Sequence, residues 1–572
     1  MSVEHVRAHP GGYADSVTLM SVSAQAQAVP GVRAALVAMA TELNLDLLAG
    51  LGMAAPAGAG PNDLLVAVRA DDADALAAAL AVIDEAIAGR PGGPGGGPGG
   101  GPLGGAAAGV ADQAATSPPP RTTASAIRRT GPGLALISVP GQHAYAEALD
   151  ALLAGSDVMI FSDNVPVEQE IALKDLAAER GLLVMGPDCG TAIVGGVGLG
   201  FSHRVPAGPV GVVAASGTGA QQVVCLLDAA GVGVSAVLGL GGRDLSAAVG
   251  GRSARTALAA LDADPATKLI LVVSKPPDPA VAAGLAEHAA TLGTEVRFAL
   301  IGPEQPDLTE AVETALRALG RPVPDWPSWP AAGGGHAGGG YAAGGGHAGG
   351  EPESGTGPAG SGVLRGLFAG GTLCEEAMAI AAGRLGAVYS NVPLRPEWLI
   401  DPLAPAGQTG RHTMIDFGDD TLTVGRPHPM IDQRIRLDRL AAEAADPGTA
   451  VILLDVVLGH GAHPDPAAEL APAIAAALAG RASGGPGGSG GPGGSGGESG
   501  RRLSIVASLI GAGSDPQDPA RQAAALAAAG AHVFASNAQA ARFACDLAGA
   551  DSTGVGRTST NSAGTETKGA RP

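Results

Sequence analysis

The feature that most constrains this chain is a regular alternation of short apolar runs with helical stretches between residues 132 and 330. Runs such as LALISVP, DVMIFSD, GPVGVVAAS and KLILVVSKP have the composition of buried strands, and segments such as AYAEALDALLAG and GAQQVVCLLDAAG have that of helices. Apolar strands that alternate with helices predict a parallel sheet covered on both faces. Ligands of such sheets bind at the carboxyl ends of the strands, so candidate site residues are expected there.

Three segments of this region recur later in the chain, in the same order. GVVAASGTGAQQVV (211–224) is matched by GLFAGGTLCEEAMAI (366–380), LGGRDLS (240–246) by FGDDTLT (417–423), and ALDADPATKLILVVSKPPDPA (260–280) by EAADPGTAVILLDVVLGHGAHPDPA (443–467). Any two α/β regions share some likeness, but the paired Ala-Asp-Pro segments that lead into a strand favour a duplication. The sequence therefore predicts tandem flavodoxin-like modules.

Tracts of almost pure Gly, Pro, Ser and Ala divide the chain, because such segments bury too little apolar area to offset the cost of ordering their backbone. We expect a small α+β domain at 1–88, a disordered linker at 89–121, a Rossmann-type domain at 122–205, a first module at 206–330, a Gly-rich linker at 331–361, a second module at 362–548 with a disordered insert at 483–500, and a disordered tail at 549–572. The repeated GGGHAGGG units with His336 and His347 fall in the Gly-rich linker.

The N-terminal domain has weaker signals. SVTLMSVSAQAQA (16–28), RAALVAMAT (33–41) and DLLVAVRA (63–70) are strand-like, and DADALAAALAVIDEAIA (72–88) has the pattern of a helix. These segments predict a ferredoxin-like or ACT-like fold.

Composition excludes several functions. The formal net charge is −20, and no basic patch is present that would neutralise nucleic-acid phosphates. The four cysteines are not in CxxC spacing, so neither a metal site nor a disulfide framework is expected. The sequence has no uninterrupted apolar stretch of about 18 residues, so no membrane span is expected. The N-terminus lacks a signal-peptide pattern, and the expected location is cytoplasmic.

The strongest candidate site is the turn that contains Ser216, Gly217 and Thr218, between an apolar strand and a helix. The first backbone N–H groups of a helix and the positive end of its dipole favour an anion such as phosphate. The second module repeats the pattern in Gly370, Gly371 and Thr372. The alternative is that Ser216 or Thr218 only caps the helix.

Other candidates follow the ends of neighbouring strands. The proposed substrate-binding residues are Asp188, Cys189, Gly241, Gly242, Arg243, Asp244, Arg426 and His428, and the proposed catalytic residues are Lys275, His460 and His463. Arg243 is suited to carboxylate or phosphate, and a histidine at a strand end can contact or accept a phosphoryl group. The competing interpretations are a buried turn for Cys189, a local ion pair for Arg243 with Asp244, and solvated loops for the histidines.

The segments PVGVVAASGTGAQQ, GLGGRDLS and LDADPATKLILVVSKPP resemble the ligase domain of the succinyl-CoA synthetase alpha subunit, and VMGPDCGTAI resembles the turn that joins its CoA-binding domain to that ligase domain. FSDNVPVEQEIALK, MGPDCGTAIV, GVGLGF and DVVLGHGAHPDP resemble the FdrA family of acyl-CoA synthetase-like proteins. The resemblance covers residues 130–475 with specific motifs.

The resemblance implies an acyl-CoA synthetase-like activity. In the synthetases, a Ser-Gly-Thr helix start binds the phosphate of a phosphohistidine, an acyl phosphate forms, and CoA displaces the phosphate. Ser216, Gly217 and Thr218 match that motif, and 122–205 matches the CoA-binding domain without its Gly-rich fingerprint. Ser274, Lys275 and Pro276 replace an acidic segment, and no ATP-grasp domain is present, so ATP and Mg²⁺ would need a partner subunit of a hetero-oligomer.

Two alternatives remain open from the sequence. Through the FdrA resemblance, the chain is a subunit of an oxamate-type carbamoyltransferase that uses carbamoyl phosphate in purine or allantoin degradation. Alternatively, it is a non-catalytic scaffold subunit that binds a metabolite. His336 resembles the phosphorylated histidine loop of the synthetases, but its Gly-rich surroundings cannot hold a nucleophile near its target, so a linker is predicted there.

Overall fold

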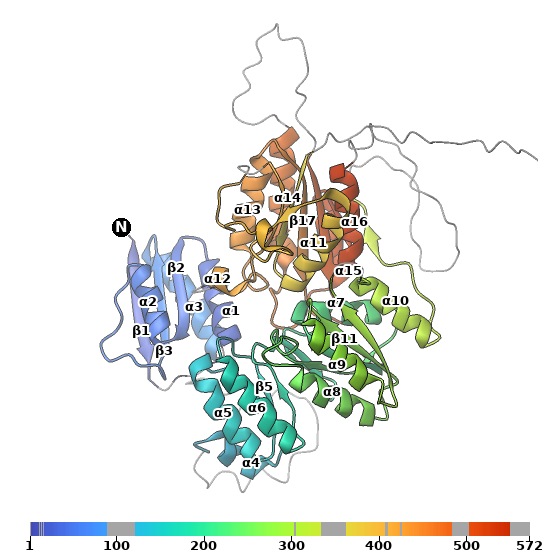
Figure 1. Cartoon of the computed structure of the whole chain (residues 1–572). Coiled ribbons are helices and arrows are strands. Elements are labelled where there is room, and N and C mark those ends of the chain that lie inside the picture. The colour runs from blue at the N-terminus through green and yellow to red at the C-terminus, as the bar shows by residue number, and fades with distance from the viewer. Residues whose placement is uncertain are drawn as a thin grey trace, which may run out of the picture.

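The computed structural model describes residues 2–88, 120–332, 362–482 and 503–549, apart from positions 11, 13, 15, 303, 304, 407–409, 424 and 425. His336 and His347 lie outside the described residues, as do most of the predicted linkers. Figure 1 shows four α/β units that follow one another along the chain, from the N-terminal domain in blue to the second module in orange and red.

The N-terminal domain contains β1 (Val3–His9), α1 (Ser16–Gln27), β2 (Val32–Met39), α2 (Glu42–Gly50), β3 (Leu64–Ala70) and α3 (Ala73–Ala88). Its sheet has the order β1-β3-β2, with β3 antiparallel to both neighbours. The prediction of a strand at 16–28 was wrong. Leu19, Val22 and Ala26 are buried at spacings of three and four residues, which is the period of a helix that packs one face on a sheet.

A half-domain of three parallel strands follows. It contains α4 (Thr123–Thr130), β4 (Leu134–Ile137), α5 (Gly141–Leu153), β5 (Asp157–Ile160), α6 (Val167–Glu179) and β6 (Val184–Met185), in the sheet order β4-β5-β6. The hairpin of β7 (Thr191–Val194) and β8 (Val197–Gly200) already belongs to the next sheet, because β7 pairs with a strand of the first module. The chain therefore passes from one sheet to the next near the cis peptide bond between Gly186 and Pro187.

The first module has a sheet of order β12-β11-β9-β10-β7-β8. Its elements are β9 (Ala207–Ala215), α7 (Gly217–Ala229), β10 (Val234–Gly239), α8 (Arg252–Ala263), β11 (Leu269–Ser274), α9 (Pro279–Ala289), β12 (Glu295–Leu300) and α10 (Leu308–Ala318). Strands β9 to β12 are mutually parallel, and all six residues of β11 are buried, as expected for a strand covered on both faces.

The second module has a sheet of order β13-β19-β18-β17-β14-β16-β15. Its elements are β13 (Ser328–Trp329), β14 (Val363–Phe368), α11 (Gly371–Leu385), β15 (Val388–Tyr389), the short helix η2 (Pro396–Trp398), β16 (His412–Asp416), α12 (Asp420–Thr423), α13 (Arg434–Ala445), β17 (Thr449–Val457), α14 (Pro466–Ala482), β18 (Ser504–Ile510), α15 (Pro519–Ala528), β19 (Ala531–Phe534) and α16 (Asn537–Gly549).

The predicted pair of modules is confirmed by their topology. Strands β9, β10, β11 and β12 occupy the same order in the first sheet as β14, β16, β17 and β18 in the second. Each of the three repeated segments falls on equivalent elements, so the Gly-Thr pairs begin α7 and α11. The two modules also share one apolar core, in which Val223 and Leu227 of α7 are grouped with Leu373 and Met378 of α11.

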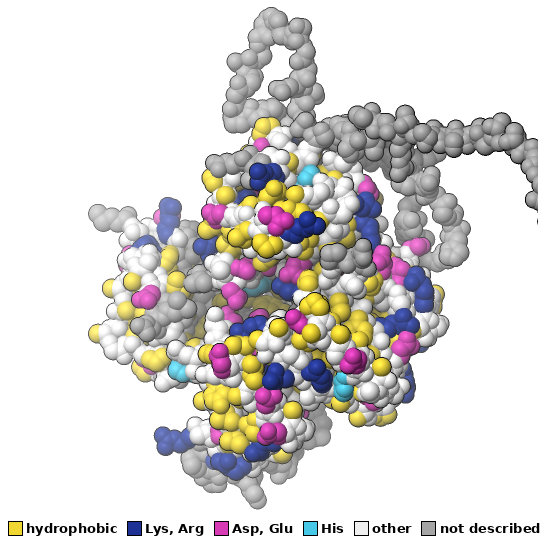
Figure 2. Space-filling model, in the orientation of Figure 1, with side chains coloured by type: hydrophobic (Ala, Val, Ile, Leu, Met, Phe, Trp, Pro, Cys, Tyr) yellow, Lys and Arg dark blue, Asp and Glu magenta, His cyan; other side chains and the backbone are white. Residues whose placement is uncertain are grey.

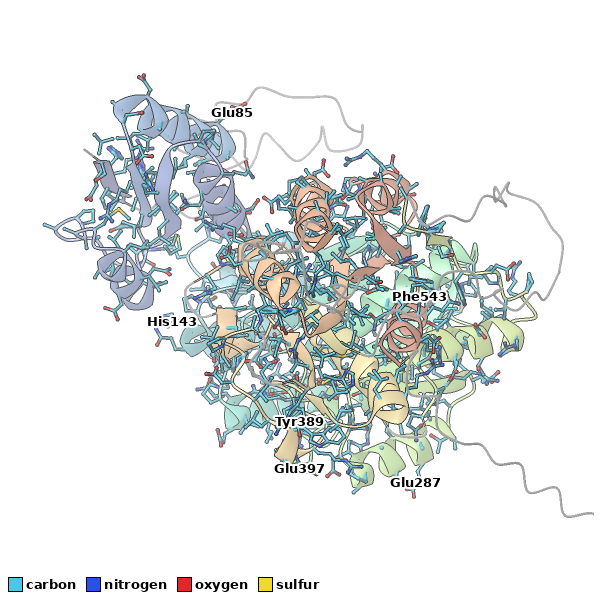
Figure 3. All side chains as sticks on the ribbon, turned by 90° about the horizontal axis from the view of Figure 1, so that it is seen from above. Glu85, His143, Glu287, Tyr389, Glu397 and Phe543 are labelled. Atoms are coloured by element: carbon cyan, nitrogen blue, oxygen red, sulfur yellow. The ribbon has the colours of Figure 1, made fainter. Side chains whose placement is uncertain are left out.

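The face seen in Figure 2 is hollowed near its centre, with acidic, basic and apolar side chains around the hollow. From above, Glu85 of the N-terminal domain and Glu287 of the first module lie toward opposite ends of the molecule (Figure 3).

None of the helices in the described ranges combines the length and the apolar character that a membrane crossing requires.

Candidate functional site

Helices α7 and α11 begin next to each other, although 154 residues separate their first residues, Gly217 and Gly371. Ser216 caps α7 with its Oγ, which accepts a hydrogen bond from the N–H of Gly219 at 3.0 Å. The same oxygen lies 2.6 Å from Oγ1 of Thr372 in α11. Two positive helix ends therefore converge on one place, which favours an anion there.

The predicted Gly-Thr residues of both modules are brought together at this junction. Thr218 lies against Gly370, where a Cβ would be 2.8 Å from the threonine Cγ2. Ser216 and Thr372 are buried. The structure thus places the six residues predicted for phosphate binding in a single cluster, which we call the helix-start cluster: Ser216, Gly217, Thr218, Gly370, Gly371 and Thr372.

A buried carboxylate holds the turn before α11. The N–H groups of Ala369 and Gly370 donate to the two oxygens of Asp455 in β17, each at 2.8 Å. Arg436 of α13 forms an ion pair with the same carboxylate. Burial raises the pKa of Asp455 against the opposing effect of Arg436. The turn is therefore fixed from a neighbouring strand, and α11 has no side-chain cap of its own.

Lys275 follows β11 and points at the start of α11. Its Nζ lies 3.3 Å from Oε1 of Glu375. A Cβ on Gly371 would be 3.0 Å from this Nζ and 2.7 Å from Oδ2 of Asp416, so both charged groups face the same glycine. Burial lowers the pKa of Lys275, but Glu375 and Asp416 outweigh it and the net shift is upward. The lysine is therefore cationic beside the helix-start cluster.

Asp416 ends β16 and is buried, and its Oδ1 accepts the N–H of Gly418 at 2.9 Å. Burial raises the pKa of its carboxyl to about 7, although Lys275 opposes the shift. His428 approaches the same glycine: a Cβ on Gly418 would lie 2.7 Å from its Nε2 and 3.2 Å from Oδ1 of Asp416. Burial, and then Arg436, lower the pKa of His428 to about 4, so the imidazole is neutral near pH 7.

Asp188 and Arg243 stand at the edge of the same site. Asp188 has a left-handed backbone (φ 57°) after the cis peptide bond, and its side chain is open to solvent. Desolvation by the protein atoms around it raises the pKa of its carboxyl to about 7, and Asp420 and Asp163 add to the shift, while Lys275 and Arg243 oppose it. Two cations and several carboxylates from three units therefore meet at these strand ends.

Some predicted residues have other contacts. Cys189 is 2% exposed, its Sγ donates to the carbonyl of Thr191, and burial raises its pKa to about 12. Asp244 is fully buried, pairs with Lys174, and accepts the N–H groups of Ser253 and Ala254 at the start of α8. Contacts within the protein thus occupy both side chains and give them a structural role, and the predicted contact of Cys189 and Asp244 with a substrate stays a prediction.

The remaining predicted residues lie in loops around the site. Nδ1 of His463 accepts the N–H of Asp465 at 3.0 Å, and its Nε2 is 3.5 Å from Glu469 in α14. The backbone of His460 donates to the carbonyl of Ser202 at 2.8 Å, and the residue is exposed, as is Arg426. The side-chain contacts of His463 thus stay within its own loop and helix, whereas its backbone N–H donates to the carbonyl of Met430 and its carbonyl accepts from the side chain of Gln517.

Sequence reasoning missed Asp416 and Glu375. Asp416 directly precedes FGDDTLT, the segment matched to LGGRDLS, so the repeat itself pointed to that strand end. Glu375 lies three residues after Thr372, a spacing that places the two side chains on one face of a helix. Neither residue stands out until the two modules are packed together.

Comparison with known proteins identifies the family. A family model described as CoA-ligase matches residues 367–547. The protein YahF of Escherichia coli K12 is 35% identical over 533 residues, which is 91% of this chain and 94% of YahF. The chain belongs to the CoA-ligase superfamily, in the FdrA-like family of YahF. The predicted family is therefore confirmed.

Two further similarities are more limited. The succinate–CoA ligase alpha subunit of Aquifex aeolicus is 29% identical over 160 residues, which is 27% of this chain and 51% of that subunit. The solved acetyl-coenzyme A synthetase 1 of Ca. Korarchaeum cryptofilum aligns over 73% of this chain and 82% of its own, with 14% identity and a TM-score of 0.25.

A second family model, described as the heavy metal-associated domain of AllF, matches residues 1–98 of this FdrA-like chain. Residues 1–98 contain no cysteine, so no thiolate is available for a soft metal ion. Within the described ranges, no group of three or more His, Cys, Asp or Glu side chains is arranged to hold a metal. The described residues of the N-terminal domain therefore do not fit a site for a soft metal ion.

Proposed function

We propose that this FdrA-like chain transfers an acyl group between a phosphate mixed anhydride and CoA, with the phosphate bound at the helix-start cluster. Membership of the CoA-ligase superfamily supports the reaction class. The observation that carries the proposal is the 2.6 Å contact between Ser216 Oγ and Thr372 Oγ1, where two helix N-termini converge.

The charge distribution suits departure of phosphate. When a nucleophile attacks the carbonyl carbon of an acyl phosphate, the bond from that carbon to the phosphate oxygen breaks and negative charge grows on that oxygen. The first N–H groups of α7 and α11, the two hydroxyls and Lys275 would stabilise this charge. Glu375 and Asp416 keep Lys275 protonated for this role.

The half-domain fits one phosphate group of CoA. Helix α5 starts at Gly141, after the carboxyl end of β4, and no side chain caps it. The carbonyl of Pro140 accepts the N–H of His143, so the N–H groups of Gly141 and Gln142 are those that a phosphate would use. CoA bound there would supply a thiolate as the nucleophile. ATP and Mg²⁺ would be brought by a partner subunit.

One observation favours a second reaction, transfer of a carbamoyl group from carbamoyl phosphate to oxamate. Lys275 and Arg243 both lower the pKa of the carboxyls of Asp188 and Asp420, so the two cations lie near the same pair of carboxyls. Such a pair suits a ligand with two negative charges. Carbamoyl phosphate and acyl phosphates are both mixed anhydrides, and the same helix-start cluster would serve either.

Phosphate release separates the two reactions. The chain is purified with the products of its neighbouring genes and supplied either with ATP, CoA and a panel of acids or with carbamoyl phosphate and oxamate. CoA-dependent release supports the ligase, and release that requires oxamate supports the transferase.

A paired substitution tests the phosphate site itself. We expect Ser216→Ala with Thr372→Val to lower turnover by about 10- to 100-fold, the effect of losing two donors to a developing charge. The control is Ser235→Ala with Thr267→Val, a second hydroxyl pair at 2.6 Å in the first module, which should change turnover by less than about twofold. Unchanged turnover in the first variant would rule out the proposed phosphate site.

A further inference from the structure

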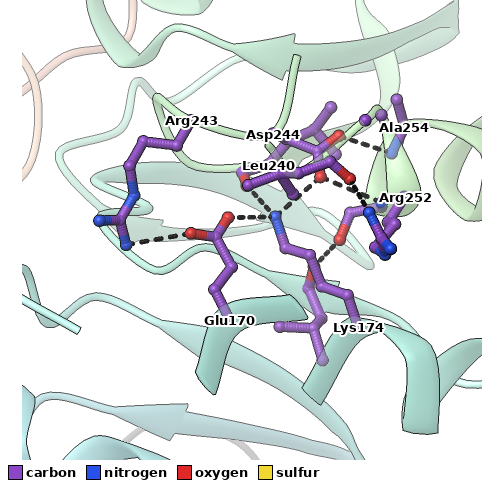
Figure 4. Close-up of polar contacts among 12 residues, drawn as sticks. Glu170, Lys174, Leu240, Arg243, Asp244, Arg252 and Ala254 are labelled. Carbon is purple, nitrogen blue, oxygen red and sulfur yellow. Dashed lines mark hydrogen bonds and ion pairs between the residues drawn. The ribbon is translucent and has the colours of Figure 1, made fainter. Parts of the chain in front are cut away.

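The guanidinium of Arg243 is held by Glu170, as Figure 4 shows, and much of its side chain is exposed. Its Nη2 donates to the carbonyl of Val165 at 2.7 Å and lies 3.0 Å from Oε2 of Glu170. No side chain or carbonyl in the described ranges bonds its Nε or Nη1, and the side chain is 46% exposed. The arginine therefore presents its remaining N–H groups to the solvent-filled side.

The anchor for Arg243 is itself rigid. Glu170 and Lys174 lie one turn apart on α6 and are both buried. Nζ of Lys174 is 2.7 Å from Oε1 of Glu170, 2.8 Å from Oδ1 of Asp244 and 3.2 Å from the carbonyl of Leu240. Glu170, Asp244 and Lys174 together carry two carboxylates and one ammonium group. The guanidinium of Arg243 supplies the second positive charge that balances them. Because an unbalanced buried charge is costly, the guanidinium is drawn to Glu170.

Arg243 is also placed at the candidate site. The loop that carries it packs on the cis turn: a Cβ on Gly241 would be 2.0 Å from the carbonyl oxygen of Pro187, and one on Gly242 would be 3.6 Å from Oδ2 of Asp188. The charges of Arg243 and Lys275 act on the same two carboxyls, those of Asp188 and Asp420. The anchored arginine and the lysine beside the helix-start cluster thus lie near the same two carboxyls.

We propose that Arg243 binds an anionic oxygen group of the substrate and that Glu170 is the positioning residue that holds the guanidinium in place for it. The inference rests on the proposed function for the place of the leaving phosphate, and it adds a second anion-binding point supplied jointly by the half-domain and the first module. Because Asp163, Asp188 and Asp420 stand nearby, a singly charged carboxylate suits this point better than a phosphate dianion.

Binding of two simple probes tests the assignment. The full chain is titrated calorimetrically with malonate, for a carboxylate at Arg243, and separately with inorganic phosphate. Arg243→Gln is expected to weaken malonate binding at least 10-fold, and Glu170→Gln about 5- to 10-fold. Phosphate affinity should change less than about twofold in both, and should fall only when Ser216 and Thr372 are replaced. A larger effect on phosphate than on malonate would assign the Arg243 point to phosphate and overturn the carboxylate preference.

The positioning role has its own readout. If Glu170 acts through Arg243, the double variant binds malonate no more weakly than Arg243→Gln alone. In Arg243→Ala, millimolar guanidinium should restore malonate affinity, and this rescue should disappear when Glu170 is also Gln. A purely structural role for Glu170 would move stability without removing the rescue.

The matched control is Asp175→Asn, which removes an exposed ion pair with Arg252 from the same helix and should leave both affinities unchanged. Additive effects of Glu170→Gln and Arg243→Gln, or a wild-type chain that binds neither probe, overturn the inference. The two claims can fail separately. If the Ser216 and Thr372 variants keep full turnover while Arg243 still binds malonate, the proposed phosphate site is wrong and the carboxylate point at Arg243 is supported.

Discussion

The starts of α7 and α11 occupy equivalent positions in two modules of the same topology, but they are held in different ways. Ser216 caps α7 with its own hydroxyl. The turn before α11 has glycine at that position and is held instead by Asp455, which is paired with Arg436. A local cap leaves the rest of a turn free to vary, whereas a carboxylate from a neighbouring strand ties the turn to the core.

The two modules also contribute different charges. In the first module, Ser274 pairs with Ala215, so the next residue, Lys275, lies opposite the residue that precedes α7. In the second module, Leu454 pairs with Leu367, and the same register places Val457 opposite the residue that precedes α11. Lysine in the first module thus has valine as its counterpart in the second. The first module therefore supplies the cation, and the second supplies the carboxylates of Glu375 and Asp416 that hold it. The site is complete only where the two unlike halves meet.

The largest difference between the modules should appear in the free energy of unfolding when the residue that holds each helix start, Asp455 or Ser216, is replaced. Asp455→Ala leaves Arg436 buried without a partner and frees two backbone N–H groups, so we expect a loss of about 3–5 kcal/mol in the free energy of unfolding. Ser216→Ala removes a cap and the hydrogen bond to Thr372 but leaves no charge unpaired, at a cost of about 1–2 kcal/mol. Urea unfolding of both variants measures the difference, and equal losses would contradict the distinction between the two starts.

The second-largest effect is expected on turnover, because only the first module supplies a cation to the site. Lys275→Met should lower turnover about 100-fold, or about 2.7 kcal/mol of transition-state stabilisation, because one donor to the departing phosphate is lost. Lys268, an exposed lysine that bonds the carbonyl of Pro265 just before the same strand, provides the control as Lys268→Met. Phosphate release in the assay of the proposed function compares them, and a loss of similar size in both would exclude a specific role for Lys275.

The smallest effect concerns the carboxyl of Asp416. Its folded-state pKa of about 7 lies above the ordinary value of 3.8, so the folded protein favours the protonated form. Its contribution to stability is complete below about pH 4 and is lost as the pH rises through 7. Asp416→Asn removes this dependence. Between pH 5 and pH 8, the free energy of unfolding of the variant should therefore rise by about 1–3 kcal/mol relative to that of the wild type.

Thermal unfolding at a series of pH values measures this gain. Lys275 keeps Glu375 as a partner in the Asp416→Asn variant, so the lysine is not left alone. A difference between variant and wild type that does not change with pH would show that Asp416 is ionised in the folded protein throughout the range.

The sequence predicted the alternating elements and the paired modules well, because buried parallel strands have a composition that few other segments share. It failed at α1, whose Ala- and Ser-rich segment shows little contrast between its faces until Leu19, Val22 and Ala26 are seen to be buried. It identified Arg243 and Lys275 from their places at strand ends. It did not identify Glu170, because a carboxylate inside a helix looks like any surface residue until its burial is known.

What the sequence determined by itself was local: which segments form strands, which glycines and hydroxyls begin helices, and that one pattern occurs twice. The tertiary structure decided which of these meet. Ser216 and Thr372 are 156 residues apart, and their contact depends on the packing of α7 against α11 in a shared apolar core. The pairing of Lys275 with Glu375 depends on the same packing, whereas that of Arg243 with Glu170 depends on a second apolar core between the half-domain and the first module. In both cases burial of apolar surface brings together the elements that carry the charges.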